Sequence, residues 1–213
     1  MKYKYLNEVL LNWGDSDEDF QDNNIIKAPD IKTKITQYFI YRVEDKPSKI
    51  KIFAHFDWPE FKKYEDKVYI NGKHVELDDS YKGYTLDEFK PGEYKVYIED
   101  IDQITNCQCM FYECTQLVSV PLFDVSNVLS MESMFAFCWN LISVPLFDTV
   151  NVKDMGEMFR SCINLVNVPL FSPLKQVKNM DKMFWNCQKL SAETKSYFLW
   201  GQKYNFKKHK MIK

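Results

Sequence analysis

The chain has 213 residues, of which 46% are hydrophobic and 16% aromatic, enough for a substantial buried core. Its formal net charge is −2, but the two halves differ: residues 1–105 hold 16 Lys and Arg against 22 Asp and Glu, and the remainder holds 12 against 8. Neither half has the basic excess of a nucleic-acid-binding domain, so the charge argues against a nucleic-acid partner.

No apolar run reaches the length of a membrane-spanning helix, so we expect no membrane insertion. The apolar residues 9–11 are too few for the core of a signal peptide, and no cleavage site of small residues follows them. The absence of both signals predicts a location in the cytoplasm or, for a viral protein, in the virion, with the cell surface as the alternative.

Residues 1–34 are predicted to form an extended N-terminal arm. Residues 15–24 are acidic and resemble a calcium loop in composition, but the central glycine and terminal glutamate of an EF-hand are missing. A solvated linker or a partner-docking arm explains this stretch better than a metal site does. Such an arm suits packing on another subunit, so a homo-oligomer or an assembly through the termini is an expected arrangement.

Residues 35–105 are predicted to form a small antiparallel β-sandwich. Residues 35–43 are dense in β-branched and aromatic side chains, which favour strands. Asn71-Gly72 lies between two short apolar runs and is a strong hairpin signal. Several such strands at regular spacing indicate a sandwich. Residues 89–96 are similar to a turn of immunoglobulin-like modules, which implies an Ig-like arrangement.

One sequence motif recurs between residues 106 and 190. Met-Phe-x-x-Cys-x-x-Leu begins four copies, and Val-Pro-Leu-Phe follows in the first three. A fixed period in the twenties predicts a solenoid, because each unit is too short to bury its own apolar side. We expect each Met-Phe segment to form a helical turn and the next segment a short strand. The copies align on four cysteines at spacings of 24, 24 and 25: Cys114, Cys138, Cys162 and Cys187.

The repeated pattern, with Ser-Asn-Val-x-x-Met-x-x-Met-Phe between copies, resembles the BspA-like leucine-rich repeats. It is closer still to their Mycoplasma-type lipoprotein variant. Asn127-Val128 and Asn151-Val152 match that variant, and Gln176-Val177 departs from it. The resemblance implies a leucine-rich-repeat solenoid over residues 106–190 and a surface or interaction protein. Repeats of this kind also occur in bacteriophage genomes.

Residues 191–213 are predicted to form a C-terminal cap and a basic tail. Ser191 is a capping residue, and the apolar residues after it have helical spacing. The lysine-rich tail is interpreted as a solvated end in preference to a docking segment. The expected fold class is therefore α+β: a β-sandwich, then a leucine-rich-repeat solenoid, then a helical cap.

The cysteines are the obvious candidates for chemistry. Four of them occupy one repeat position, so they are expected to stack at about the spacing of neighbouring strands, 4.7–5 Å. Buried thiols are the favoured interpretation, although disulfides between neighbouring copies are within reach. Cys107-x-Cys109 lacks a second ligand pair at zinc-like spacing. We expect no catalytic residue, no cofactor and no metal.

The residues most suited to binding a partner occupy positions that vary between otherwise constant copies. Aromatic and arginine side chains at such positions are natural anchors in protein interfaces. The alternative is ordinary packing at the edge of the repeats. The predicted protein-contact residues are Tyr112, Phe137, Trp139, Arg160 and Trp185.

These features predict a non-enzymatic structural or protein-interaction protein whose partners are other proteins. The expected setting is a phage virion, in which the repeats present a surface for assembly or host attachment. A bacterial or protozoan surface adhesin is the alternative. An enzyme with a site in the β-module has less support, because no catalytic constellation is visible there.

Overall fold

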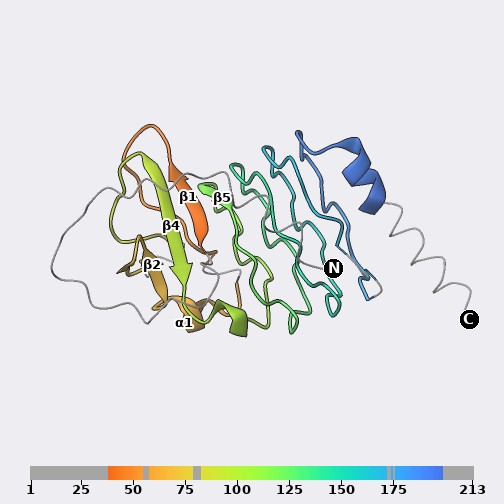
Figure 1. Ribbon diagram of the computed structural model, residues 1–213, viewed down its shortest axis with the longest axis horizontal. Coiled ribbons are helices and arrows are strands. Elements are labelled where there is room, and N and C mark those ends of the chain that lie inside the picture. Colours follow the sequence, from red (N-terminus) through yellow and green to blue (C-terminus); the bar gives the residue numbers. More distant parts are fainter. Residues whose placement is uncertain (1–37, 55–57, 79–82, 172–173, 175, 199–213) are drawn as a thin grey trace, which may run out of the picture. The chain divides into compact units, whose positions relative to one another are not determined.

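A computed structural model describes residues 38–54, 58–78, 83–171, 174 and 176–198, all within one compact unit, Lys34–Lys213. The predicted N-terminal arm and basic tail lie outside these residues. A small antiparallel sheet comes first along the chain, the repeats follow, and a helix comes last (Figure 1).

The sheet has five strands in the order β3-β2-β4-β1-β5, and all neighbours are antiparallel. Two short helical elements, α1 and a 3-10 helix, connect parts of this region. The elements are β1 (Phe39–Val43), α1 (Phe61–Tyr64), β2 (Val68–Ile70), β3 (Lys73–His74), β4 (Gly92–Ile98), the 3-10 helix (Ile101–Gln103) and β5 (Leu117–Ser119).

The predicted hairpin at Asn71-Gly72 is confirmed. β2 and β3 pair on either side of it, and the φ angles of Asn71 and Gly72 are 49° and 78°. Positive φ at both central residues characterises the tight turn that matches the twist of two antiparallel strands. Asn and Gly tolerate this conformation better than other residues do.

The sheet buries one face in the hydrophobic core. Phe39, Tyr41 and Val96 are fully buried, and the Phe39 ring lies 5.3 Å from Phe111 of the first repeat. The sequence predicted two packed sheets, whereas the strands of the described residues belong to a single sheet. Residues 48–51 and 84–89 meet only in isolated bridges, and the first repeat packs on the inner face of the sheet.

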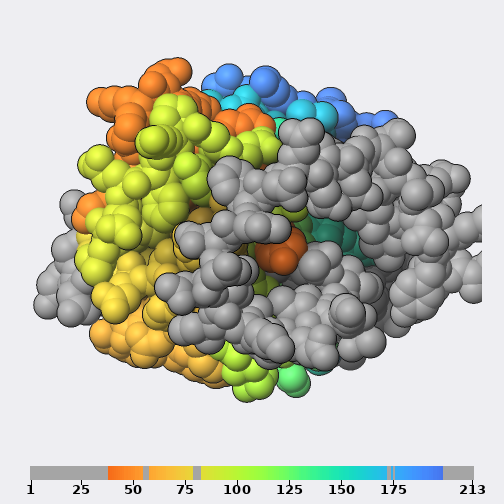
Figure 2. Space-filling model, turned by 60° about the vertical axis from the view of Figure 1, so that its left-hand side comes forward, coloured from red at the N-terminus to blue at the C-terminus, as the bar shows by residue number. Residues whose placement is uncertain are grey.

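Figure 2 shows one face of the sheet region, in which the residues around β4, in yellow-green, lie beside the first described residues, in orange. This arrangement agrees with the pairing of β1 and β4.

The Met-Phe segments stack in register through backbone hydrogen bonds. Alternate N–H groups of one copy donate to carbonyl oxygens of the next copy, at 2.7–2.9 Å in the second segment. The four bonds from that segment run from Met131 to Asp154, from Ser133 to Gly156, from Phe135 to Met158 and from Phe137 to Arg160.

The remaining N–H groups of each segment bond within it. Ala136 N–H, for example, donates to the Ser133 carbonyl three residues back, at 3.1 Å. The predicted helical turn is therefore wrong, because an α-helix directs every N–H group to the carbonyl four residues back. The three-and-four spacing of apolar residues belongs instead to a series of tight turns. In these turns, N–H groups alternate between bonding within the segment and bonding to the next copy.

The second half of each copy continues the sheet. Ser119 of β5 bridges Ser143, and Ser143 bridges Asn167, both in parallel. β5 therefore pairs with β1 on one side and with the second repeat on the other. As a consequence, one hydrophobic cluster extends from Phe39 to Phe198.

A column of phenylalanine rings runs through the repeats. Their centroids are 5.5, 5.6 and 5.6 Å apart and their planes nearly parallel, in the order Phe111, Phe135, Phe159 and Phe184.

The helical cap predicted after residue 190 is present over residues 192–198. The hydroxyl of Ser191 accepts a hydrogen bond from Thr194 N–H at 3.1 Å, as an N-cap residue does. Phe198 packs against Phe184, at 5.2 Å between ring centroids, and so extends the core beyond the last copy.

Candidate protein-contact site

Four of the five predicted contact residues form a continuous row across consecutive copies. The Tyr112 ring meets the Phe137 ring edge-on at 5.5 Å. The Arg160 guanidinium lies 5.3 Å from the Phe137 ring centroid and 5.1 Å from that of Trp185. We call Tyr112, Phe137, Arg160 and Trp185 the aromatic–arginine row. It arises because residues that follow Met-Phe are brought side by side when the copies stack in register.

The backbone at the row has an unusual conformation. Phe137 has a φ of 62°, in the left-handed region that bulky residues seldom adopt. The equivalent residues Glu113, Ser161 and Asn186 have φ angles of 59°, 57° and 60°. The conformation is thus a property of the repeat, and the inter-copy hydrogen bonds hold it against a cost of about 1 kcal/mol per residue.

Arg160 is held by charge as well as by the rings. Its Nη1 donates to Glu157 Oε2 at 2.7 Å, and Lys182 Nζ lies 3.6 Å from Glu157 Oε1. The hydrogen bond from Arg160 and the two nearby cations lower the pKa of Glu157. The sequence interpretation missed Glu157 and Lys182. The spacing of three between Glu157 and Arg160 was the available signal, because such pairs meet within one turn.

Trp139, the fifth predicted contact residue, lies outside the row. It follows Cys138, and 49% of its surface is exposed. Its neighbour Asn140 donates a hydrogen bond to Glu44 Oε1 at 3.2 Å. Trp139 is therefore an exposed aromatic residue close to a link between the repeats and the sheet region.

The four aligned cysteines form a ladder of buried thiols. The Sγ atoms of the last three donate to a backbone carbonyl of the preceding copy: Cys138 to Phe111 at 3.0 Å, and Cys162 and Cys187 to the equivalent carbonyls at 2.9 Å. Cys114 Sγ donates to the Ile52 carbonyl of the sheet region at 3.5 Å. Burial raises the pKa of Cys114 to about 12 and that of Cys187 to about 11. These thiols are therefore protonated hydrogen-bond donors at neutral pH and poor nucleophiles.

Within the described ranges, no cluster of three or more His, Cys, Asp and Glu side chains has the geometry to hold a metal ion. His74 is exposed, with Nε2 2.9 Å from the Asp66 carbonyl oxygen. In the same part of the chain, no helix is long and apolar enough to cross a bilayer.

The stacking in register defines this chain as a protein built from tandem repeats. The chain belongs to the family described as Mycoplasma protein of unknown function, DUF285, whose model matches residues 88–197, just over half of its length. The match starts before β4 and ends within the C-terminal helix, so it covers every copy of the repeat. Neither the curated proteins nor the solved structures yield a match.

Proposed function

We propose that the chain is a non-enzymatic protein-interaction protein, whose repeats form a short leucine-rich-repeat solenoid and whose aromatic–arginine row binds a protein partner. The observation that carries this proposal is the row itself, three aromatic rings and one guanidinium in mutual contact across four copies. Tyr, Trp and Arg are the residue types that dominate binding energy in protein interfaces.

The row is organised before any partner binds. Arg160 is fixed between two rings and paired with Glu157, so little side-chain entropy remains to be lost on binding. The column of buried phenylalanine rings gives the repeats that carry the row a rigid interior. Trp185 is 54% exposed and would supply most of the new buried area.

The partner is expected to present an apolar or aromatic group to Trp185. Because Arg160 already has Glu157 as its ion-pair partner, a carboxylate of the bound protein would have to compete with that pair for the guanidinium. The enzymatic alternative draws no support from the ladder thiols, which burial keeps protonated. The phage-virion and adhesin settings stay predictions, and mass spectrometry of intact particles would test the first of them.

The test is affinity capture from the native source with the tagged full chain. Three proteins are compared: the wild type, the Tyr112→Ala/Trp185→Ala double variant, and Leu86→Ala, which removes a side chain of similar exposure (48%) from the sheet region. We expect one protein to be captured by the wild type and the control, and to be reduced at least tenfold with the double variant. Equal capture by all three proteins, at equal melting temperature, would overturn the proposal.

A further inference from the structure

The repeats carry a second exposed surface that the aromatic–arginine row does not use. Leu122, Leu146 and Leu170 occupy the same position in three copies and are 44%, 57% and 51% exposed. The parallel bridges Ser119↔Ser143 and Ser143↔Asn167 keep these positions in register. The three side chains therefore form one line, with a spacing of about 4.8 Å between layers. We call them the leucine stripe.

The leucine stripe is held in place by its neighbours in sequence. A half-buried proline precedes each leucine and a buried phenylalanine follows it, so the backbone cannot rotate the leucine inward. Single exposed leucines are ordinary, but an aligned and contiguous set marks a contact surface. The structure thus fixes three large apolar side chains facing outward in a line.

We propose that the leucine stripe binds the leucine stripe of a second copy of this chain, in a two-fold symmetric dimer with the two stacks antiparallel. A stripe of three equally spaced leucines is self-complementary about its middle member. The two-fold axis at Leu146 brings that residue against its own counterpart. It also brings Leu122 against Leu170 of the partner subunit. This proposal concerns a different face from the aromatic–arginine row and does not depend on it.

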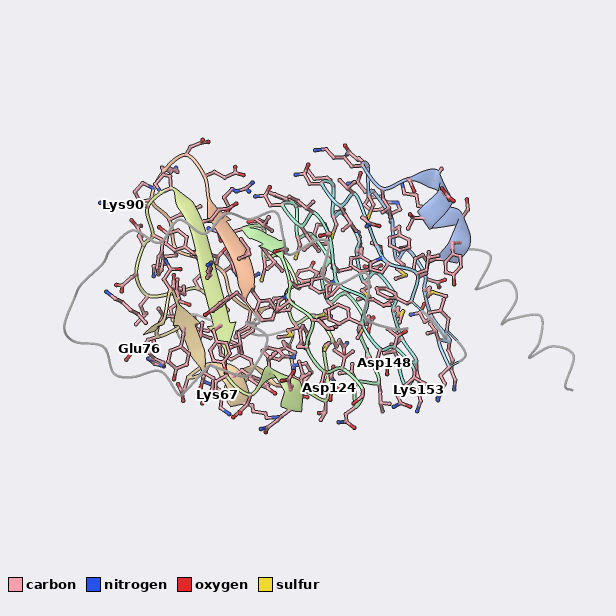
Figure 3. All side chains as sticks on the ribbon, in the orientation of Figure 1. Lys67, Glu76, Lys90, Asp124, Asp148 and Lys153 are labelled. Atoms are coloured by element: carbon pink, nitrogen blue, oxygen red, sulfur yellow. The ribbon has the colours of Figure 1, made fainter. Side chains whose placement is uncertain are left out.

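The charges along the edge beside the stripe select the antiparallel arrangement. Asp124, Asp148 and Lys153 follow one another along this edge in the direction of the stack (Figure 3). Asp102 lies before them, where its carboxylate accepts a hydrogen bond from Asp124 N–H at 3.0 Å, and Lys178 lies beyond, one copy after Lys153. The edge is therefore acidic toward the sheet and basic toward the C-terminal helix.

An antiparallel dimer places the acidic end of one edge against the basic end of the other. Asp124 then faces Lys153 of the partner subunit, and Asp102 faces Lys178 of the partner subunit, while Asp148, beside the axis, lies near its own counterpart. In a parallel two-fold dimer these edges would lie on opposite sides of the paired stripes, so the two attractive pairs would not form, and the antiparallel arrangement is favoured.

The size of the surface indicates a reversible dimer. A standard stable interface buries about 800 Å² on each partner. Three leucines and their prolines supply only the apolar centre of such an area, with the charged edge as its rim. We therefore expect a dissociation constant on the order of 10 μM, corresponding to about −7 kcal/mol of binding free energy.

Sedimentation velocity of the full chain, between about 1 and 100 μM, tests the leucine stripe at concentrations that bracket this constant. We expect the wild type to pass from monomer to dimer across this range. Leu146→Asp brings two carboxylates together at the axis and should raise the dissociation constant at least tenfold. The control Leu86→Asp makes the same change at a leucine of similar exposure and should leave the constant unchanged. Equal melting temperatures show that both variants are folded.

The charge arrangement is tested by reversal. Lys153→Glu alone should weaken the dimer, because it then faces Asp124 of the partner subunit, and adding Asp124→Lys should restore it. A wild type that stays monomeric at 100 μM overturns the proposal, as does a dimer that Leu146→Asp leaves intact. A dimer that Lys153→Glu leaves unchanged or strengthens overturns the antiparallel arrangement. None of these results alters the capture experiment on Tyr112 and Trp185, so the two proposals fail separately.

Discussion

The sheet region, residues 38–105, and the repeats, residues 107–190, share one hydrophobic core but are held together by different kinds of contact. The contacts of the sheet region join particular residues and have no equivalent elsewhere in the chain. The Tyr41 hydroxyl donates to the Ile52 carbonyl at 2.9 Å, and Trp58 Nε1 donates to the Asn106 carbonyl at 2.8 Å. In the repeats the same bond recurs from the second copy to the fourth, as the thiols show.

This difference shows how each region should respond to damage. A unique contact between segments far apart in sequence has no substitute, so its loss disturbs the packing of the whole sheet. A repeated contact joins nearest neighbours only, so its loss weakens the interface between two copies. The following predictions test that distinction, from the largest expected effect to the smallest.

Removing a ring from the middle of the phenylalanine column should have the largest effect. Phe135 is fully buried between two parallel rings, so Phe135→Ala leaves a cavity and should lower the free energy of unfolding by about 4 kcal/mol. Phe184 is half-buried at the end of the column, and Phe184→Ala should cost about half as much. Urea denaturation measures both. Equal losses of free energy by the two variants would show that stability is not a sum of interactions between neighbouring copies.

Two glycine substitutions compare the regions directly. A Cβ at Gly83 would lie 2.2 Å from the Phe53 carbonyl oxygen, and its φ is +65°, so Gly83→Ala should cost about 3 kcal/mol. A Cβ at Gly156 would meet the Asn179 side-chain amide at 2.5 Å. Because that amide can move, Gly156→Ala should cost about 1 kcal/mol. Thermal unfolding measures both variants, and Gly83→Ala should lower the melting temperature more than Gly156→Ala does, because its clash is with the backbone.

The thiol ladder predicts a loss of stability at high pH. The pKa of Cys114 is raised to about 12 and that of Cys187 to about 11, so folding favours the protonated thiols. Their contribution is complete below the pKa of the unfolded thiol, near 8.5, and is lost as the pH rises through these values.

Urea denaturation between pH 7 and pH 11 measures this loss. The Cys138→Ser variant is a suitable comparison, because its hydroxyl does not ionise in that range. At pH 8 iodoacetamide should modify the half-buried Cys109 first and the ladder thiols only after unfolding. Rapid modification of Cys138 in the folded protein would contradict the ladder.

Removing one buried hydroxyl, that of Thr149, should stabilise the fold. Thr149 is fully buried and its Oγ1 has no hydrogen-bond partner, whereas the equivalent residue of the previous copy is Val125. Thr149→Val keeps the shape of the side chain and removes an unsatisfied polar group. The free energy of unfolding should therefore rise by about 1 kcal/mol. A decrease would show that the hydroxyl has a partner, such as a bound water molecule.

The smallest effect on stability is expected at Trp139. Its exposure of 49% predicts that Trp139→Ala leaves the melting temperature within a few degrees. Because Trp139 lies outside the aromatic–arginine row, the variant should also capture the partner of the proposed function as the wild type does. Differential scanning calorimetry and affinity capture test the two parts. A large fall in melting temperature would instead assign Trp139 to the core.

Local patterns predicted β1, the hairpin of β2 and β3, β4 and the C-terminal helix, but not that residues 48–51 and 84–89 form isolated bridges. The Asn71-Gly72 turn and the Ser191 cap depend on residues within a few positions of each other, so both can be predicted from the local sequence. The Met-Phe segment was interpreted as helical because apolar residues three and four apart suit a helix. Its hydrogen bonds go instead to a segment 23 residues away, as from Phe135 to Met158, and a local pattern cannot show this.

The candidate site divides in the same way. Tyr112, Phe137, Arg160 and Trp185 were found from the sequence, because variable positions in a repeat identify an outer surface. Their mutual contacts were not, because Tyr112 and Arg160 stand at the first position after Met-Phe and Phe137 at the second. The backbone at this second position is left-handed in every copy, and the structure places the Phe137 ring in contact with Tyr112 and Arg160. Glu157, which holds Arg160, was missed although its spacing of three from Arg160 was visible in the sequence.

The period of 24 residues alone determined that the copies stack, because no single copy has enough apolar surface to fold by itself. The tertiary structure decided what joins this stack to the rest of the chain. β5 pairs with β1 on one side and bridges the second copy on the other, so the predicted second sheet is replaced by the repeats. That choice depends on hydrogen bonds between residues more than seventy positions apart, such as Ile40 and Ser119, and no local preference encodes them.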